Sequence, residues 1–71
     1  MHAYNLFRRK GDEDVYCAVP EDRAVPPFVS ASAWEFRGKV GESSLPAGFD
    51  PRAASAGVRF NGFYVYQSAP R

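Results

Sequence analysis

The segment Phe49–Gln67, with the sequence FDPRAASAGVRFNGFYVYQ, most strongly constrains what this chain can fold into. Asp50 directly precedes Pro51, and helix starts prefer this order of N-cap residue and first-turn proline. Gly57 is a typical residue for a helix end, so the pattern predicts a short helix over Pro51–Ala56. Two helical turns do not persist in water by themselves. The rest of the chain therefore has to supply a surface that holds this helix.

A strongly aromatic strand is predicted after the helix, over residues 59–67. Alternation places Phe60, Gly62, Tyr64 and Tyr66 on one face, and Asn61, Phe63, Val65 and Gln67 on the other. Both faces thus carry large apolar side chains. Such a strand is usually central in its sheet, or has its second face covered by a partner.

Three earlier segments have the period-two pattern of strands. Residues 3–9 and 14–20 flank the polar turn 10–14 and predict a β-hairpin. Residues 34–40 alternate more regularly than any other part of the chain. The predicted apolar face consists of Trp34, Phe36, Gly38 and Val40, and the predicted solvated face of Glu35, Arg37 and Lys39.

The connection between the hairpin and the third strand, residues 20–33, is rich in proline. Prolines at 20, 26 and 27 oppose a regular helix or strand. We expect a long loop with Phe28 and Val29 tucked into the core. Proline also suits the first position of a helix, so a helical turn within residues 26–33 stays open.

Together these elements predict one small α+β domain over residues 1–71, in the order β-β-β-α-β. The sheet is expected to be antiparallel with three or four strands, and the short helix to pack on one face. An open SH3-like or OB-like barrel is the alternative. With 71 residues the core is small, and with no isoleucine and two leucines it has to be built largely from aromatic side chains and valine.

Charge and hydropathy argue against several classes of protein. The net charge of +1 gives no general attraction to nucleic acid or to an anionic membrane. No apolar run reaches the 18 residues of a membrane span, and the N-terminal MHAYNLFRRK lacks the pattern of a signal peptide. With one cysteine, we expect a cytoplasmic protein. Arginine outnumbers lysine seven to two, which is typical of a GC-rich bacterial genome.

The residues needed for catalysis or for metal binding are nearly absent. Cys17 lies among valines in a predicted strand, and the single histidine, His2, is near the chain start. One cysteine and one histidine are too few for a usual zinc site. The carboxylates at 12–14 lie in the predicted hairpin turn and match no calcium loop. We therefore expect no enzyme activity, no cofactor and no metal.

The aromatic cluster is the main candidate for function. It provides the core, and part of it is expected to form an interface, since tyrosine and tryptophan are enriched at binding hot spots. The favoured class is a small non-enzymatic module that forms a homodimer or docks on a protein partner. The predicted interface residues are Phe63, Tyr64, Tyr66 and Trp34.

A nucleic-acid-binding module is the alternative class. Basic side chains between exposed aromatics are typical of proteins that bind single strands. The residues that would form this site are Arg8, Arg9, Lys10, Arg37 and Lys39. The acidic turn beside the first three of them weakens this interpretation.

Overall fold

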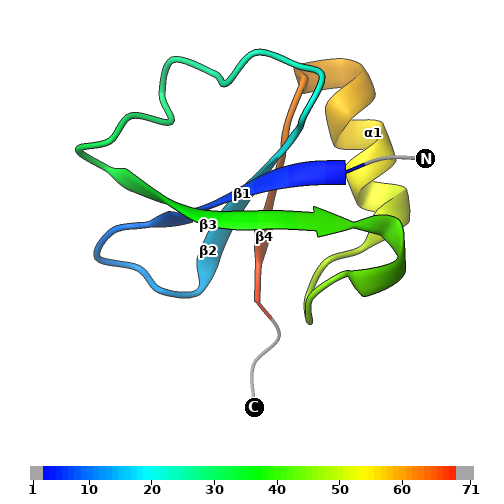
Figure 1. Ribbon diagram of the computed structural model, residues 1–71, viewed down its shortest axis with the longest axis horizontal. Coiled ribbons are helices and arrows are strands. Elements are labelled where there is room, and N and C mark those ends of the chain that lie inside the picture. Colours follow the sequence, from blue (N-terminus) through cyan, green and yellow to red (C-terminus); the bar gives the residue numbers. More distant parts are fainter. Residues whose placement is uncertain (1–2, 69–71) are drawn as a thin grey trace.

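The computed structural model describes residues 3–68, apart from the side chain of Glu42, and shows a four-stranded antiparallel sheet with one helix (Figure 1). The elements are β1 (Ala3–Arg9), β2 (Val15–Pro20), β3 (Trp34–Gly41), a 3-10 turn (Glu42–Ser44), α1 (Pro51–Asn61) and β4 (Tyr64–Gln67). The predicted α+β class and the β-β-β-α-β order are confirmed.

The strands are arranged in the order β3-β1-β2-β4, so β1 and β2 are central and β3 and β4 are the edges. The predicted hairpin of β1 and β2 is present, with Leu6 opposite Ala18 and Phe7 opposite Cys17. Because β3 and β4 do not pair with each other, the described sheet is open. The alternative of a barrel is therefore not adopted.

The two faces of the sheet carry separate hydrophobic clusters. We call one the helix face: Tyr4, Leu6, Ala18 and Tyr66 pack there with Phe49 and with Ala54 of α1. We call the other the loop face, and its buried residues are Cys17, Val19 and Trp34. Figure 1 shows α1 on one side of the strands and the connection 21–33 extending on the other.

The helix start is as predicted, but its end is not. Asp50 caps the N-terminus, since its Oδ1 accepts hydrogen bonds from the backbone N–H groups of Arg52 (2.9 Å) and Ala53 (3.4 Å). The helix then continues through Gly57 and ends at Gly62, which has the left-handed conformation with φ 87°. The prediction that Gly57 ends the helix was wrong.

The longer helix shortens the last strand. β4 covers only Tyr64–Gln67 rather than residues 59–67. Phe60 belongs to α1, where its side chain is 77% exposed, and not to a strand face shared with Tyr64 and Tyr66. Of the predicted two-faced pattern, the alternation of Tyr64 and Tyr66 with Phe63 and Val65 remains.

A β-bulge in β3 overturns the predicted alternation of that strand. Gly38 lies opposite Leu6, but Phe36 lies opposite Phe7, so the register shifts by one residue at Arg37. Trp34 and Phe36 are consequently on the loop face, while Gly38 and Val40 are on the helix face. The positive φ of Gly38, 113°, suits glycine at such a bulge.

The proline-rich connection forms turns rather than a helix. Backbone hydrogen bonds run from the N–H of Val29 to the carbonyl of Pro26 (3.0 Å) and from the N–H of Trp34 to the carbonyl of Ser30 (2.8 Å). Val29 packs against the loop-face cluster. Phe28 contacts the cluster with its ring but stays partly exposed, so only Val29 is tucked in as expected.

Candidate functional site

The four predicted interface residues do not form one surface. Trp34 and Tyr66 are buried within the chain, with 9% and 7% of their surface exposed, and Phe63 and Tyr64 are half-buried. Trp34 and Phe63 belong to the loop face, whereas Tyr64 and Tyr66 belong to the helix face. The thickness of the sheet therefore separates the two pairs.

The tyrosines of the helix face form a packed aromatic group under α1. The Tyr66 ring stacks with those of Tyr16 and Tyr64, with centroids 5.5 Å away in each case. Phe49 meets the Tyr66 ring edge-on at 5.2 Å. The Tyr64 hydroxyl accepts a hydrogen bond from the backbone N–H of Asp50 (3.2 Å), which ties β4 to the helix start. Burial, and then the neighbouring Tyr16 and Tyr64, raise the pKa of Tyr66 from 10.0 to about 12.

The loop face presents apolar side chains that its loop does not fully cover. One row of cross-strand partners runs across all four strands, from Phe36 to Phe7, Cys17 and Val65. Cys17 is completely buried, but Phe36 is 58% exposed and Val65 is 45% exposed. The rings of Phe7 and Phe36 meet edge-on at 5.6 Å.

The connection over this face adds further exposed apolar surface. Phe28 packs its ring edge-on against Phe63 at 5.0 Å and against Trp34 at 6.0 Å. Phe28 and Val25 are nevertheless exposed, and both line a shallow hollow of about 500 Å³ together with Phe63. The loop face and its connection therefore carry four large exposed apolar side chains: Val25, Phe28, Phe36 and Val65.

The five basic residues of the alternative site are dispersed, and four of them have partners. Arg8 and Arg37 both contact Oε2 of Glu35, at 3.2 and 3.0 Å. By strand alternation, Arg8 points to the helix face and Arg9 to the loop face.

Of the other three basic side chains, those of Lys39 and Lys10 bind groups within the chain, and that of Arg9 binds none among the described residues. Lys39 pairs with Glu21 at 3.3 Å. The Nζ of Lys10 donates to the carbonyl of Ala31 at 2.7 Å. Arg9 is exposed, and no ion pair joins it to another described residue. Partial neutralisation and dispersal over two faces weaken the interpretation as a nucleic-acid site, which stays a prediction.

The burial of Cys17 is unfavourable for nucleophilic chemistry at this residue, and the residues that the structure describes form no cluster of metal ligands. Cys17 is fully buried, and desolvation raises the pKa of its thiol from 9.0 to about 11, which disfavours the reactive thiolate. No group of three or more histidine, cysteine, aspartate or glutamate side chains is placed to hold a metal ion within residues 3–68. His2 lies outside the described residues.

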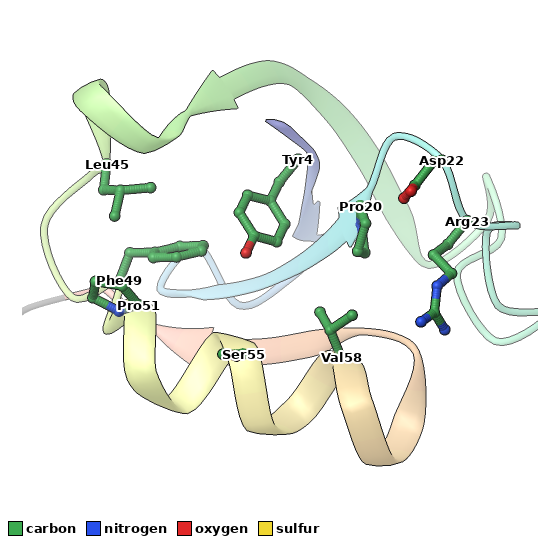
Figure 2. A pocket seen from close by; sticks show the side chains of 9 residues that line it. All are labelled: Tyr4, Pro20, Asp22, Arg23, Leu45, Phe49, Pro51, Ser55 and Val58. Carbon is green, nitrogen blue, oxygen red and sulfur yellow. The ribbon is translucent and has the colours of Figure 1, made fainter. Parts of the chain in front are cut away.

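A groove that sequence reasoning missed lies beside α1 (Figure 2). We call it the Tyr4 groove; its volume is about 410 Å³. Its lining residues are Tyr4, Pro20, Asp22, Arg23, Leu45, Phe49, Pro51, Ser55 and Val58. They come from β1, the end of β2, the turn after it, the segment before α1 and α1 itself. No local motif links these segments, so no sequence signal was available to find them.

Fold and surfaces together define a small single-domain α+β protein with an open antiparallel sheet, one face under a helix and the other under a loop. No protein-family model, curated protein or solved structure matches the chain. Within residues 3–68, no helix has the length and apolar character that crossing a membrane requires.

Proposed function

We propose that this protein is a small non-enzymatic interaction module that associates with itself, as a homodimer, or with another protein through the loop face of its sheet. The carrying observation is the distribution of exposed apolar side chains. Among the described residues, the large exposed ones are Val25, Phe28, Phe36, Phe60 and Val65. All except Phe60 lie on the loop face or in the connection over it. Several exposed apolar side chains on one side of a small protein are typical of a protein-binding site.

The proposal keeps part of the predicted interface and replaces the rest. Phe63 and Trp34 support this surface from below through their contacts with Phe28. Tyr64 and Tyr66 pack under α1 instead, so Phe36 and Val65 take their place as the side chains that a partner would contact. Packed aromatic side chains such as Trp34 and Phe63, next to exposed apolar side chains, are typical of the centre of protein interfaces.

Association through the face of the sheet is better supported than pairing at the β3 edge. β3 carries three charged residues, Glu35, Arg37 and Lys39, and a bulge at Arg37. Charges and bulges on an edge strand oppose the addition of a further strand. A partner that covers Phe36 and Val65 removes apolar surface from water without disturbing that edge.

The test compares a loop-face double variant, Phe36→Ser with Val65→Ser, with the matched control Phe60→Ser on α1. Size-exclusion chromatography with light scattering should give a mass of twice the 7.9 kDa chain for the unmodified protein and the control. The double variant should run as a monomer. If the unmodified protein is a monomer, the same three proteins are compared in pull-downs from native lysate, where only the double variant should lose its partner.

A monomer whose captured proteins are the same for all three would contradict the proposal. The nucleic-acid alternative gives a different result in the same pull-downs. It predicts captured RNA or DNA whose binding falls steeply between low and moderate salt, because released counterions drive such binding. It also predicts that Arg9→Ala with Lys10→Ala weakens capture. The lone, buried cysteine suits a reducing compartment, so the proposal places the protein in the cytoplasm.

A further inference from the structure

The Tyr4 groove has two chemically different ends. Figure 2 shows Leu45, Phe49 and Pro51 at one end and the side chains of Asp22 and Arg23 at the other. We propose that this groove binds a free α-amino acid with a large apolar side chain, with the side chain at the apolar end and the charged head group between Asp22 and Arg23.

The apolar end is preformed by packing within the chain. Phe49 is buried, and its ring is held by the rings of Tyr4 at 5.2 Å and Tyr64 at 5.1 Å. Leu45 and Val58, both half-buried, complete this part of the lining. The volume of about 410 Å³ lies in the range of small-molecule pockets. An aromatic or long aliphatic side chain therefore has a rigid apolar surface to cover.

The charged end is placed by the turn that follows β2. The N–H of Arg23 donates to the carbonyl of Pro20 at 3.0 Å, which brings Asp22 and Arg23 beside the groove. The preceding acid, Glu21, pairs with Lys39 and is not part of the lining. Among the described residues, neither Asp22 nor Arg23 forms an ion pair.

Opposite charges at one end select a zwitterion. The ammonium group of an amino acid complements Asp22, and its carboxylate complements Arg23 with the bidentate geometry that guanidinium favours. A simple carboxylic acid gains the contact with Arg23 but meets the like charge of Asp22. A simple amine gains the contact with Asp22 but meets the like charge of Arg23. The groove thus discriminates by charge arrangement as well as by apolar contact.

The groove shares Arg23 with the surface proposed for protein association, because Arg23 also lines the hollow beside Val25 and Phe28. The walls of the groove are α1 and the helix-face residue Tyr4, whereas Phe36 and Val65 point to the loop face. The variants chosen for the two tests lie apart: Ser55 lines the groove but not the hollow, and Phe36 and Val65 line neither, so the tests of amino-acid binding and of association are distinguishable.

The first experiment titrates the folded protein with L-phenylalanine and follows amide chemical shifts by two-dimensional NMR. Saturable shifts are expected for Tyr4, Leu45 and Val58, with a dissociation constant of about 1 mM or below, because the ligand is small and its charges stay partly solvated. 3-Phenylpropionate and phenethylamine each lack one charge and should bind about two- to fivefold more weakly. Glycine, which lacks the side chain, should cause no saturable shift.

Variants separate binding in the groove from weak surface association. Ser55→Phe places a ring in the groove and should abolish the shifts, while Ala56→Phe, an exposed neighbour on α1 outside the lining, should leave them unchanged. Asp22→Asn should remove the preference for phenylalanine over 3-phenylpropionate. Far-UV circular dichroism confirms that each variant is folded.

Three results would overturn the inference. The first is the absence of saturable shifts up to about 10 mM phenylalanine, a concentration well above the dissociation constant expected for a ligand of this size. The second is equal affinity for the three phenyl compounds. The third is unchanged binding of phenylalanine by the Ser55→Phe variant. Equal affinity would mean that the charged end takes no part in recognition. Unchanged binding by Ser55→Phe would place the ligand elsewhere.

Discussion

Cys17 and Tyr66 are buried on opposite faces of the same sheet, and both carry ionisable groups. Neither group is charged at neutral pH, and burial opposes the charged form of each. The pKa of the Cys17 thiol is raised to about 11 and that of the Tyr66 hydroxyl to about 12. Both residues therefore act as packing residues, and their side chains lose their protons only at alkaline pH.

The raised pKa values predict a loss of stability at high pH. Since each group has a higher pKa in the folded than in the unfolded chain, the unfolded chain releases its protons first. The stabilising contribution is complete below about pH 9 and is lost as pH rises through 9.0–11 for Cys17 and 10.0–12 for Tyr66. Urea denaturation at a series of pH values should show this decline.

The control is the double variant Cys17→Ala with Tyr66→Phe, which keeps apolar side chains at both positions. Its free energy of unfolding should be lower at neutral pH, because a cavity replaces the sulfur, but should fall less steeply above pH 9. An equally steep fall in the variant would contradict the assignment of these two groups.

At the scale of the element, α1 is shaped by two glycines with different tasks. Gly62 ends the helix by adopting the left-handed conformation. Gly57 lies within the helix and lets it approach β4 closely, since a Cβ at this position would lie 2.9 Å from the Phe63 carbonyl oxygen. The close contact with the start of β4 explains why position 57 is a glycine, although the local sequence pattern predicted that this glycine ends the helix.

Replacing Gly57 by alanine tests this assignment. Helix propensity alone predicts a gain of about 0.5–1 kcal/mol. We expect instead a net loss of about 1 kcal/mol, because the added methyl group pushes α1 away from β4, and overpacking of this kind costs about 1–3 kcal/mol. Chemical denaturation of Gly57→Ala measures the difference.

The matched control is Ala56→Gly, an exposed site on the same helix, which should cost about 1 kcal/mol by propensity alone. Gly57→Ala and Ala56→Gly are opposite exchanges at neighbouring positions, yet both are expected to destabilise. A stabilised Gly57→Ala protein would show that the approach of α1 to β4 is not limiting.

At the scale of the whole molecule, one sheet separates two hydrophobic clusters that share strands β1 and β2. Phe49 anchors α1 on the helix face, and Trp34 anchors the connection on the loop face. Since each central strand contributes to both clusters, neither side is expected to unfold without the other.

Single core truncations test this coupling. Phe49→Ala and Trp34→Ala should each lower the free energy of unfolding by about 3–5 kcal/mol, whereas Phe28→Ala, at a partly exposed site, should cost clearly less. In the unmodified protein, Trp34 fluorescence reports the loop face and far-UV circular dichroism reports the helix. Coincident denaturation curves are expected, and separate midpoints would reveal two independently stable parts.

Much of this fold was accessible from local sequence patterns. Period-two alternation located β1 and β2, and the polar turn between them fixed their antiparallel pairing. The Asp50–Pro51 pair located the start of α1, because capping depends on hydrogen bonds within a few residues. These features share one physical reason: the contacts that determine them lie close together along the chain.

The remaining features were decided by tertiary contacts. Packing against β4 carries α1 through Gly57, and the bulge opposite β1 turns Trp34 and Phe36 to the loop face. The Tyr4 groove unites Tyr4, the turn after β2 and α1, which are distant in sequence. By itself the sequence determined that the last strand has two apolar faces. Only the tertiary structure decided that α1 covers one of them and that the other stays partly open, because surface coverage depends on how the whole chain packs.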